Sequence, residues 1–524
     1  MQHECEVCIV GAGPAGLSIA RKLASNGIQA TVVESGGRNP TLNAQQSSAG
    51  KPAGYPYHRL EKALYSGIGG SAQLWWGHNR FRPLDPIDFE ERQGIPQSGW
   101  PFGLNALLPY YEAAQAMLPL GPFDYTAEFW EQDETPKFPF PDGEIETTVF
   151  QTTSGGASGA RAIAELGADP VFRLMTETTV TELLVEESGH RIEQARLRHG
   201  DGSESMISAD VFVLAAGAFD NTRLLLMSNE KWTKGIGNTN GLVGRFFMEH
   251  PAVSTARWVP NDATLFGQYG LYRQHTVRGT PIIGTLTVAD EIKRREGLLN
   301  SAIFLSESDD LRASDVYRSL SMFSPKGLRN MRWTPSIYAE NFGNIARHPI
   351  RATSTLFQVA TGRTQERRKV FDLRVVSEQS PNPQSRLFLD SRVDEKGLPR
   401  MRLDWRFNEL DKWSIRRTQE ILAEAVRKAG MGRVEHFYGD ERPPARIYGQ
   451  RHQMGTTRMH EDPRRGVVDA DTRVHDVHNL YVTGSSVFPT GGHANTTLTI
   501  MALALRLADH LADLFNERRG IKSH

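Results

Sequence analysis

Short apolar runs and a helical repeat open this chain. Val7-Cys-Ile-Val10 has the length and composition of a buried parallel strand. Apolar residues then recur at helical spacing from 17 to 24, and Asn26-Gly27 supplies a stop signal. Thr31-Val-Val33 is a second apolar run. The pattern therefore predicts strand, helix and strand in succession, as in a parallel α/β unit.

The pattern changes farther along the chain. Residues 210–217 read as a buried strand that ends in small residues and leads into a helix. Residues 280–288 and 386–390 contain alternating apolar segments that indicate strands of a second, largely antiparallel sheet. Further helices are expected over 101–117, over 412–430 and from about Thr496 to the C-terminal region. The sequence has no internal repeat and no low-complexity linker, so we expect lobes that are interleaved along the chain.

Glycines lie where the first predicted strand turns into its helix. In Gly11-Ala-Gly-Pro-Ala-Gly16, Gly11 permits the tight turn, Gly13 lets the backbone approach a pyrophosphate, and Gly16 lets helix and strand pack closely. Glu34 ends the second strand and can accept hydrogen bonds from an adenosine ribose. This unit predicts dinucleotide binding without distinguishing FAD from NAD.

Three later segments favour FAD. Gly70 and Ser71 belong to a glycine-rich stretch that lets backbone lie against a flat ligand. Ala216 follows a strand that returns beneath the dinucleotide, and Gly484-Ser485 precede the helix that starts near Thr496. The N-terminus of that helix carries partial positive charge and free N–H groups, which would stabilise the anionic edge of a reduced flavin.

Composition excludes several other functions. The 524 residues are 39% hydrophobic and 23% charged, with a formal net charge of −1, as in an ordinary globular enzyme. Such a charge gives no reason to expect nucleic acid or a membrane as partner. The N-terminus lacks the features of a secretory signal, and the apolar stretch 497–515 is interrupted by charges. We therefore expect a cytoplasmic protein.

The two cysteines, Cys5 and Cys8, fall on the first predicted strand, where residues three apart point to opposite faces. We therefore interpret them as structural residues, and we expect no metal site.

The C-terminal segments make the interpretation specific. His452-Gln-Met-Gly-Thr-Thr-Arg-Met459 and the stretch Phe488-Pro-Thr to Asn495-Thr-Thr-Leu498, with the glycine motifs above, resemble the glucose-methanol-choline (GMC) oxidoreductases over nearly the whole chain. Within that family the resemblance is to pyranose oxidases, bacterial glycoside 3-oxidases and flavin subunits of sugar dehydrogenases. It implies that His452 and Asn495 form the catalytic pair, and that Val180 contacts the adenine.

The resemblance also implies the fold and its division. We expect an α/β protein with a Rossmann-like FAD-binding domain over 1–80, 165–250 and 445–524. An α+β substrate domain on a mostly antiparallel sheet would take 81–164 and 251–444. Within it, 309–368 is rich in Arg, Ser and Asn, and is interpreted as a lid or an oligomer contact.

Departures from the family pattern matter equally. Leu74 stands where pyranose oxidases often bond their flavin to a histidine, so noncovalent FAD is expected. The absence of cysteines after Cys8 excludes the iron–sulfur centre of membrane-bound sugar dehydrogenases, because a cluster generally needs three or four thiolates. We therefore expect oxygen or a soluble quinone-like compound as electron acceptor. Gly484 replaces an Asp of many relatives, and Thr496 replaces the usual Pro.

These residues suggest a mechanism. A neutral histidine titrates near working pH, so His452 is predicted to take the hydroxyl proton while Asn495 holds the oxygen and hydride passes to flavin N5. His493 is expected to bind substrate or to pack in the same loop, and His250 is interpreted as structural. The predicted function is oxidation of a secondary alcohol of a sugar or glycoside to the ketone. Oxidation of a sterol or aromatic alcohol and a redox-neutral lyase reaction remain alternatives, and a homo-oligomer is possible.

Overall fold

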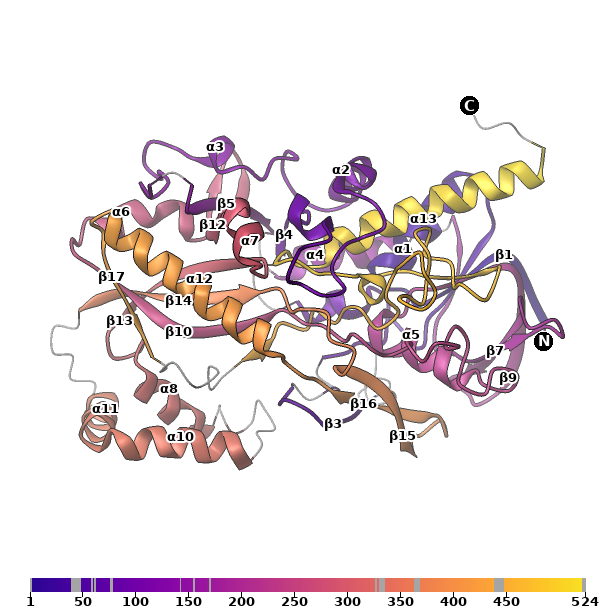
Figure 1. Cartoon of the computed structure of the whole chain (residues 1–524). Helices are drawn as coiled ribbons and strands as arrows, with labels where there is room; N and C mark the ends of the chain where they lie inside the picture. Colours follow the sequence, from indigo (N-terminus) through magenta and orange to yellow (C-terminus); the bar gives the residue numbers. More distant parts are fainter. Residues whose placement is uncertain are drawn as a thin grey trace.

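The computed structural model describes residues 2–38, 49–57, 60, 63–75, 79–141, 143–153, 156–168, 171–325, 328, 335–361, 368–437 and 447–520. Two large sheets lie end to end along the molecule, with helices packed around them (Figure 1). One sheet is mainly parallel and the other is antiparallel, so the predicted α/β class with a second antiparallel sheet is confirmed.

The first sheet is the Rossmann-like one. Its order is β6-β2-β1-β9-β8-β7, and β19 pairs with β9. Strands β6, β2, β1, β9 and β19 run parallel, whereas β7 and β8 form an antiparallel extension. The strands are β1 (Gln2–Val10), β2 (Ala30–Val33), β6 (Arg173–Met175), β7 (Thr178–Val185), β8 (Ile192–His199), β9 (Glu204–Leu214) and β19 (Leu480–Val482).

Two helices from opposite ends of the chain pack together beside this sheet. Helix α1 (Pro14–Ser25) begins with Pro14 at its first turn, where a missing N–H costs nothing. The C-terminal helix α13 (Thr497–Arg518) contacts α1 (Figure 1), and its N-terminal half is buried on nearly all sides, with Met501 to Leu505 buried in succession. Helices α2 (Leu108–Ala116), α4 (Gly156–Leu166) and α5 (Gly217–Met227) complete the cover. The long C-terminal helix predicted from about Thr496 is thereby confirmed.

The second sheet has the order β17-β10-β14-β13-β12-β5-β4, with β11 beside β12 and β18 beside β10. Each of its strand pairs is antiparallel. The strands are β4 (Arg80–Phe81), β5 (Ile145–Thr152), β10 (Pro251–Pro260), β11 (His275–Val277), β12 (Thr280–Val288), β13 (Ser301–Asp309), β14 (Lys369–Ser377), β17 (Gly432–His436) and β18 (Tyr448–Gly449).

Smaller elements flank the second sheet. Helix α12 (Glu409–Lys428) lies along it, and a capping box between Asn408 and Asp411 starts this helix. Strands β3 (Ala49–Pro52), β15 (Arg386–Val393) and β16 (Pro399–Asp404) form a third sheet beside α5. Short helices α3 (Ala127–Trp130), α6 (Leu265–Gln268) and α7 (Asp290–Glu296) occupy connections, as do 3₁₀ turns at Gly70–Leu74, Pro86–Phe89, Leu104–Ala106, Tyr269–Tyr272 and Ser485–Val487.

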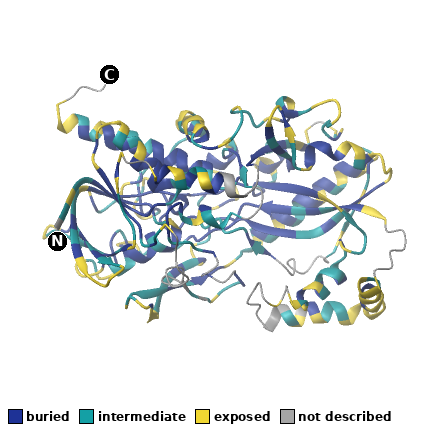
Figure 2. Ribbon diagram, turned by 180° about the vertical axis from the view of Figure 1, so that it is seen from behind, coloured by how far each residue is buried: buried dark blue, intermediate teal, exposed yellow. Residues whose placement is uncertain are grey.

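Buried side chains gather in two main cores, one around each large sheet (Figure 2). The first core combines residues from 5–250 with residues from 454–515, whereas the second takes most of its members from 127–149 and 253–447. The lobes therefore draw on alternating stretches of the chain. The expected boundary at 444/445 lies outside the described residues.

The described part of the segment 309–368 includes helices α8 (Asp315–Met322), α10 (Pro335–Arg347) and α11 (Pro349–Thr361), which project from the second sheet (Figure 1). Exposed apolar side chains mark it, including Phe342, Ile350 and Phe357. Among its described residues, none lines the cavity described below, so the geometry gives no support to a lid.

Cys5 and Cys8 are free thiols on β1, and Cys8 is buried. The described residues contain no cluster suited to a metal ion, and none of their helices has the length and apolar character needed to cross a membrane.

Candidate active site

A cavity of about 780 Å³ runs from the dinucleotide loop to the second sheet. Except for two residues, every predicted site residue lines it: Gly11, Gly13, Glu34, Gly70, Ser71, Val180, Ala216, His452, Gly484, Ser485, Asn495 and Thr496. The exceptions are Gly16 and His493. The structure thus brings together residues separated by nearly the length of the chain.

Glycines allow the backbones around the first part of the cavity to approach closely. Gly11 has a φ of +108°, and a Cβ there would lie 2.8 Å from the carbonyl oxygen of Ala215. A Cβ at Gly70 would lie 2.9 Å from the Cα of Gly13. At Gly16 a Cβ would lie 2.0 Å from the carbonyl oxygen of Gly11, which places Gly16 in the helix–strand contact and not in the cavity. This close-packed backbone cradle fits a dinucleotide.

Glu34 lies at the end of β2 and is 6% exposed. Its carboxylate accepts the N–H of Ala12 at 2.9 Å and the N–H of Gly36 at 2.8 Å, which fixes the side chain beside the glycine loop. Burial raises the pKa of Glu34, although these hydrogen bonds oppose the shift. The residue is therefore held as an acceptor facing the cavity, as ribose recognition requires.

The N-terminus of α13 forms part of the cavity wall. Thr496 is the residue before the helix, and Thr496, Thr497 and Ile500 line the cavity. No side chain caps this terminus, so its first N–H groups and the positive end of the helix dipole face the space. Together with the glycine cradle and Glu34, this terminus fits FAD, whose ring becomes negatively charged on reduction.

His452 and Asn495 meet at the far end of the cavity. The amide Nδ2 of Asn495 lies 3.2 Å from Nε2 of His452, and both side chains line the cavity. Because an amide nitrogen can only donate, Nε2 of His452 is the acceptor and carries no proton. Burial, followed by the charges of His250, Arg80 and Arg374, lowers the pKa of His452 well below its usual value. The imidazole is therefore neutral, with an unprotonated Nε2 facing the cavity.

His250 contacts the other side of the same ring. The two Nδ1 atoms of His250 and His452 lie 2.8 Å apart, and Nε2 of His250 lies 3.3 Å from the carbonyl oxygen of Gly491. A carbonyl can only accept, so His250 carries its proton on Nε2, and its bare Nδ1 accepts the Nδ1–H of His452. Burial lowers the pKa of His250 to about 4, which keeps it neutral. The Gly491 carbonyl thus sets the tautomer of both rings and leaves Nε2 of His452 free.

Strand pairing explains why these distant histidines meet. Strand β18 pairs antiparallel with the start of β10, and Met248 and Met454 exchange two backbone hydrogen bonds of 3.0 Å. His250 and His452 lie between these two pairings. The chain turns sharply at Arg451, which has a φ of +65°.

Buried Glu249 anchors the same turn. Its carboxylate accepts the N–H of Gln450 at 2.8 Å and a hydrogen bond from the Tyr57 hydroxyl. Burial raises the pKa of Glu249 to about 7. His250, which was interpreted as structural, is thus held next to the predicted base, with its Nδ1 2.8 Å from Nδ1 of His452.

His493 has a different setting. It is 1% exposed, it is absent from the cavity lining, and its ring packs against Phe150. Its Nδ1 lies 3.5 Å from a carboxylate oxygen of Asp85, and neither ring nitrogen has a hydrogen-bond partner among the described residues. Burial lowers the pKa of His493 to about 3. Of its two predicted roles, the geometry supports packing and not contact with substrate.

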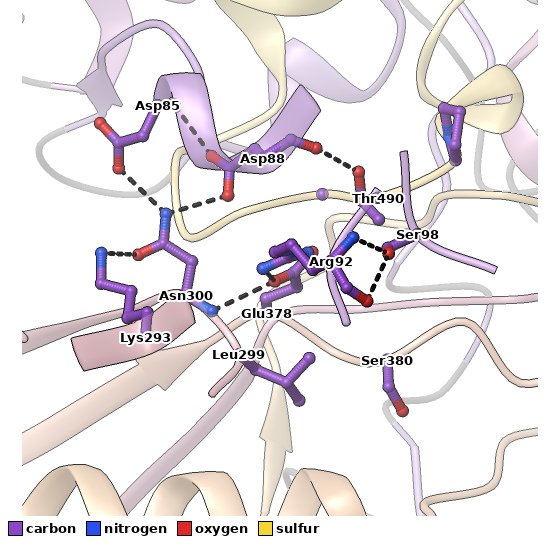
Figure 3. A network of polar contacts seen from close by, with 12 residues as sticks. Asp85, Asp88, Arg92, Ser98, Lys293, Leu299, Asn300, Glu378, Ser380 and Thr490 are labelled. Atoms are coloured by element: carbon purple, nitrogen blue, oxygen red, sulfur yellow. Dashed lines mark hydrogen bonds and ion pairs between the residues drawn. The ribbon is translucent and has the colours of Figure 1, made fainter. Parts of the chain in front are cut away.

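A buried polar network reaches Thr490, in the loop before α13 (Figure 3). The amide of Asn300 donates to Asp85 at 3.0 Å and to Asp88 at 2.9 Å, while Arg92 and Glu378 form a bidentate ion pair. Burial and the charge of Asp85 raise the pKa of Asp88 to about 8. The network joins the second sheet to the loop before α13 by a 2.6 Å hydrogen bond from the Thr490 hydroxyl to the Asp88 carbonyl.

Gly492 lets this loop pack closely against the side chain of Asp88. A Cβ at Gly492 would lie 2.2 Å from the Asp88 carboxylate, so only glycine fits there.

Several cavity residues were not identified from the sequence. Arg80, Arg374, Gln274 and Gln450 line the cavity, and the charges of the two arginines act on His452. No individual strand was predicted from the sequence at Arg80 or Arg374, and the arginines are spread among many others along the chain, so no local motif marked them. Leu74 also lines the cavity, where its hydrocarbon side chain offers no atom for a bond to flavin.

Two family models match this chain. Residues 6–285 match the model described as FAD dependent oxidoreductase, and residues 381–504 match the model described as GMC oxidoreductase. The first model covers the glycine cradle, Glu34 and Val180, and the second covers His452 and Asn495. The two matches therefore meet on the cavity described above.

This chain is also similar to individual alcohol and glycoside oxidoreductases. A 2-methyl-1,2-propanediol dehydrogenase from Mycolicibacterium austroafricanum is 25% identical over 98% of this chain and 96% of its own length. A C-glycoside 3-oxidase from Microbacterium trichothecenolyticum is 38% identical over 24% of each chain. The crystal structure of pyridoxine 4-oxidase from Mesorbium loti covers 97% of this chain and 99% of its own, with a TM-score of 0.54 and 17% identity, which is a likeness of fold.

Proposed function

This chain belongs to the FAD-dependent oxidoreductases of the GMC type, and from that membership we propose that it oxidises a secondary alcohol of a sugar or glycoside to the ketone. The observation that carries the proposal is the 3.2 Å contact between His452 Nε2 and Asn495 Nδ2 in the wall of the cavity that also contains the dinucleotide cradle. A base and a hydrogen-bond donor are thereby aimed at one point beside the cofactor site.

FAD supplies the two-electron acceptor for hydrogen leaving the alcohol carbon. The residues that would hold it are Gly11, Gly13, Gly70 and Ser71 by backbone approach, and Glu34 by hydrogen bonds to the ribose. The N-terminus of α13 would face the ring. We expect the cofactor to be noncovalent because Leu74 offers no nucleophile, so acid precipitation should release all flavin colour. Flavin retained on the denatured band would contradict this.

His452 and Asn495 act on one oxygen. A substrate hydroxyl placed between Nε2 of His452 and Nδ2 of Asn495 replaces their mutual contact. Nε2 then takes the hydroxyl proton, and the Asn495 amide donates to the oxygen as its negative charge grows. Loss of the proton raises the electron density on the oxygen, which assists departure of hydrogen from the adjacent carbon.

His250 supports the protonated state that results. Once Nε2 of His452 holds a proton, both nitrogens of that ring are donors, and the bare Nδ1 of His250 still accepts from Nδ1–H. The imidazolium therefore keeps its buried hydrogen bond throughout the reaction, and His250 need not move or exchange a proton.

The substrate class is proposed from the relatives. Two of them are named as a diol dehydrogenase and a C-glycoside 3-oxidase, which suggests a hydroxylated substrate and, from the second, a glycoside oxidised at a ring carbon. We propose oxygen or a soluble quinone-like compound as the acceptor, because Cys5 and Cys8 are too few for an iron–sulfur centre.

Anaerobic bleaching of the bound flavin tests the function. Purified FAD-loaded protein is mixed with monosaccharides, O-glycosides, C-glycosides, aliphatic diols and aromatic alcohols, and absorbance near 450 nm is followed. The proposal predicts bleaching by at least one sugar or glycoside, with a ketone as product. Bleaching by aromatic alcohols alone would contradict the substrate class. Cleavage of a substrate without any bleaching would replace oxidation by lyase chemistry.

A further inference from the structure

Two arginines face the substrate end of the cavity without a carboxylate partner. Arg80 and Arg374 both line the cavity, and both carry charge that lowers the pKa of His452. Arg374 donates to the amide oxygen of Gln450 at 2.7 Å, which is a neutral acceptor. Among the described residues, no carboxylate lies within ion-pair distance of either guanidinium; Asp372, two residues before Arg374, is paired with Arg318.

Strand register brings the two arginines side by side. Arg374 on β14 is the direct cross-strand partner of Phe304 on β13. The guanidinium carbon of Arg80 lies 4.2 Å from the centroid of the Phe304 ring. Opposite residues of an antiparallel pair have Cβ atoms about 4.5–5.5 Å apart, so the stacked Arg80 and the strand residue Arg374 share one patch of the sheet. A guanidinium stacked on a ring keeps its N–H donors at its edge, free to bind a planar acceptor.

Two of the deeply buried arginines are neutralised by carboxylates, whereas buried Arg458 donates to backbone carbonyls. Arg92 pairs with Glu378, and Arg223 pairs with Asp394. Burial and the neighbouring Arg374 lower the pKa of Arg80 to about 10, so it is still charged at neutral pH. Two like charges held together in a half-buried wall are unfavourable unless an anion arrives. The pyrophosphate of FAD does not supply one, since the glycine cradle that would hold it is built on β1 and β2 of the first sheet, whereas Arg80 and Arg374 lie on β4 and β14 of the second.

We propose that Arg80 and Arg374 form a subsite for an oxyanionic group of the substrate, a carboxylate, sulfate or phosphate carried by the sugar or its aglycone. This inference rests on the proposed alcohol oxidation and narrows its substrate class to acidic alcohols. The two guanidinium groups bind the anion, and they thereby orient the hydroxyl toward His452 and Asn495. Neutral sugars lack the group that this patch is built to accept.

The wild-type protein gives the first test. Anaerobic flavin reduction is compared within matched sets: methyl glucoside, methyl glucuronide, glucoside 6-sulfate and glucoside 6-phosphate, and phenyl glucoside beside 4-carboxyphenyl glucoside. The sets separate carboxylate from sulfate and phosphate, and a group on the sugar from one on the aglycone. One acidic member should exceed its neutral counterpart in kcat/KM by at least tenfold, and added salt should narrow the difference.

Variants test whether the preference for acidic substrates depends on Arg80 and Arg374. Arg80→Gln and Arg374→Gln should each lower kcat/KM for the acidic substrate by about ten- to a hundredfold, the scale of a lost hydrogen bond to a charged group, and this loss should exceed the loss for the neutral counterpart by at least about tenfold. Arg374→Lys should retain part of the preference. Arg392→Gln, on the exposed part of β15, is the matched control and should change neither.

Direct measurement of anion binding provides a test that does not depend on turnover. Titration with benzoate or sulfate should perturb the absorbance of bound flavin in the wild type, and the affinity should fall by about tenfold or more in both arginine variants. Equal kcat/KM for acidic and neutral members, or equal losses for both in the variants, would overturn the subsite and leave the alcohol oxidation standing. Failure of every alcohol, acidic or neutral, to bleach the flavin would instead reject the proposed function, while anion binding could still be measured.

Discussion

The two ends of the cavity are built in different ways. At the dinucleotide end, backbone atoms of neighbouring loops come together, and the glycines at 11, 13 and 70 line the cavity without side chains. At the substrate end, side chains from β4, β14 and the two segments around His452 and Asn495 supply charges and hydrogen-bonding groups. The first end offers shape and N–H groups, whereas the second offers a base, a donor and two cations.

This difference predicts how substitutions affect cofactor binding at one end and catalysis at the other. A backbone cradle fails through added volume, because a Cβ at Gly11 or Gly70 would overlap main-chain atoms. A side-chain site fails through lost chemistry, because removing one group leaves the others without their partner. Substitutions at the two ends should therefore separate cofactor affinity from the rate of chemistry.

The largest effect should come from removal of the base. His452→Ala should keep FAD and the fold but slow anaerobic flavin reduction by about 10²–10⁴-fold, since the acceptor Nε2 is lost. Stopped-flow absorbance measures the rate, and re-oxidation of reduced flavin should change far less. His493→Ala is the matched control, another buried histidine near Asn495, and it should cost much less. A severe loss in His493→Ala with a mild one in His452→Ala would transfer the base role to His493.

At the other end, added volume should act on the cofactor. Gly70→Ala places a Cβ 2.9 Å from the Cα of Gly13 at a φ of +53°, so the cradle must open. FAD should bind about tenfold more weakly, on the scale of overpacking a tight contact. Gly430→Ala is the control, because Gly430 has a φ of +67° and open space around it. Equal loss of FAD in both variants would attribute the effect to general instability and not to the cradle.

The positioning role of His250 should give a smaller effect. His250→Ala removes the acceptor for Nδ1–H of His452, and should lower the rate constant of flavin reduction about tenfold, the cost of one buried donor left unsatisfied. The substrate dissociation constant should stay nearly unchanged. His250→Gln can restore an acceptor oxygen and should recover part of the rate. A purely structural role would instead lower thermal stability in both variants without this recovery.

The smallest expected effect is a shift of the acid limb of the pH–activity profile. A base must be neutral to act, and burial together with His250, Arg80 and Arg374 lowers the pKa of His452. The acid limb of kcat/KM should therefore lie below pH 6.5, the ordinary histidine value, and activity should be level through neutral pH. An acid limb above pH 6.5 would show that the environment of His452 is not the one described.

The two ends also differ in how far the sequence predicts them. The cradle comes from consecutive residues whose spacing follows from the strand–turn–helix geometry, so Gly11, Gly13 and Glu34 were predicted directly. His452 and Asn495 were recognised by a family resemblance, and the structure brings them to 3.2 Å. Their catalytic roles stay predictions.

His250 shows what sequence alone misses. Its contact with His452 depends on β18 pairing with β10 across some two hundred residues, which no local pattern reveals. Arg80 and Arg374 were missed for the same reason, since they meet only through the register of β13 and β14. His493 shows the converse, because closeness to Asn495 in sequence did not place it in the cavity. The domain bounds and the role of 309–368 likewise stay predictions.

A double-mutant cycle on His452 and Asn495 tests the central claim most directly. Asn495→Ala alone should slow anaerobic flavin reduction by roughly 2.7–4 kcal/mol of barrier, about a hundred- to a thousandfold, as when one oxyanion donor is lost. Because both groups act on one oxygen in one transition state, the double variant should lose much less than the sum of the two single losses. Strict additivity of the two losses, with FAD retained in all four proteins, would contradict a shared site of action.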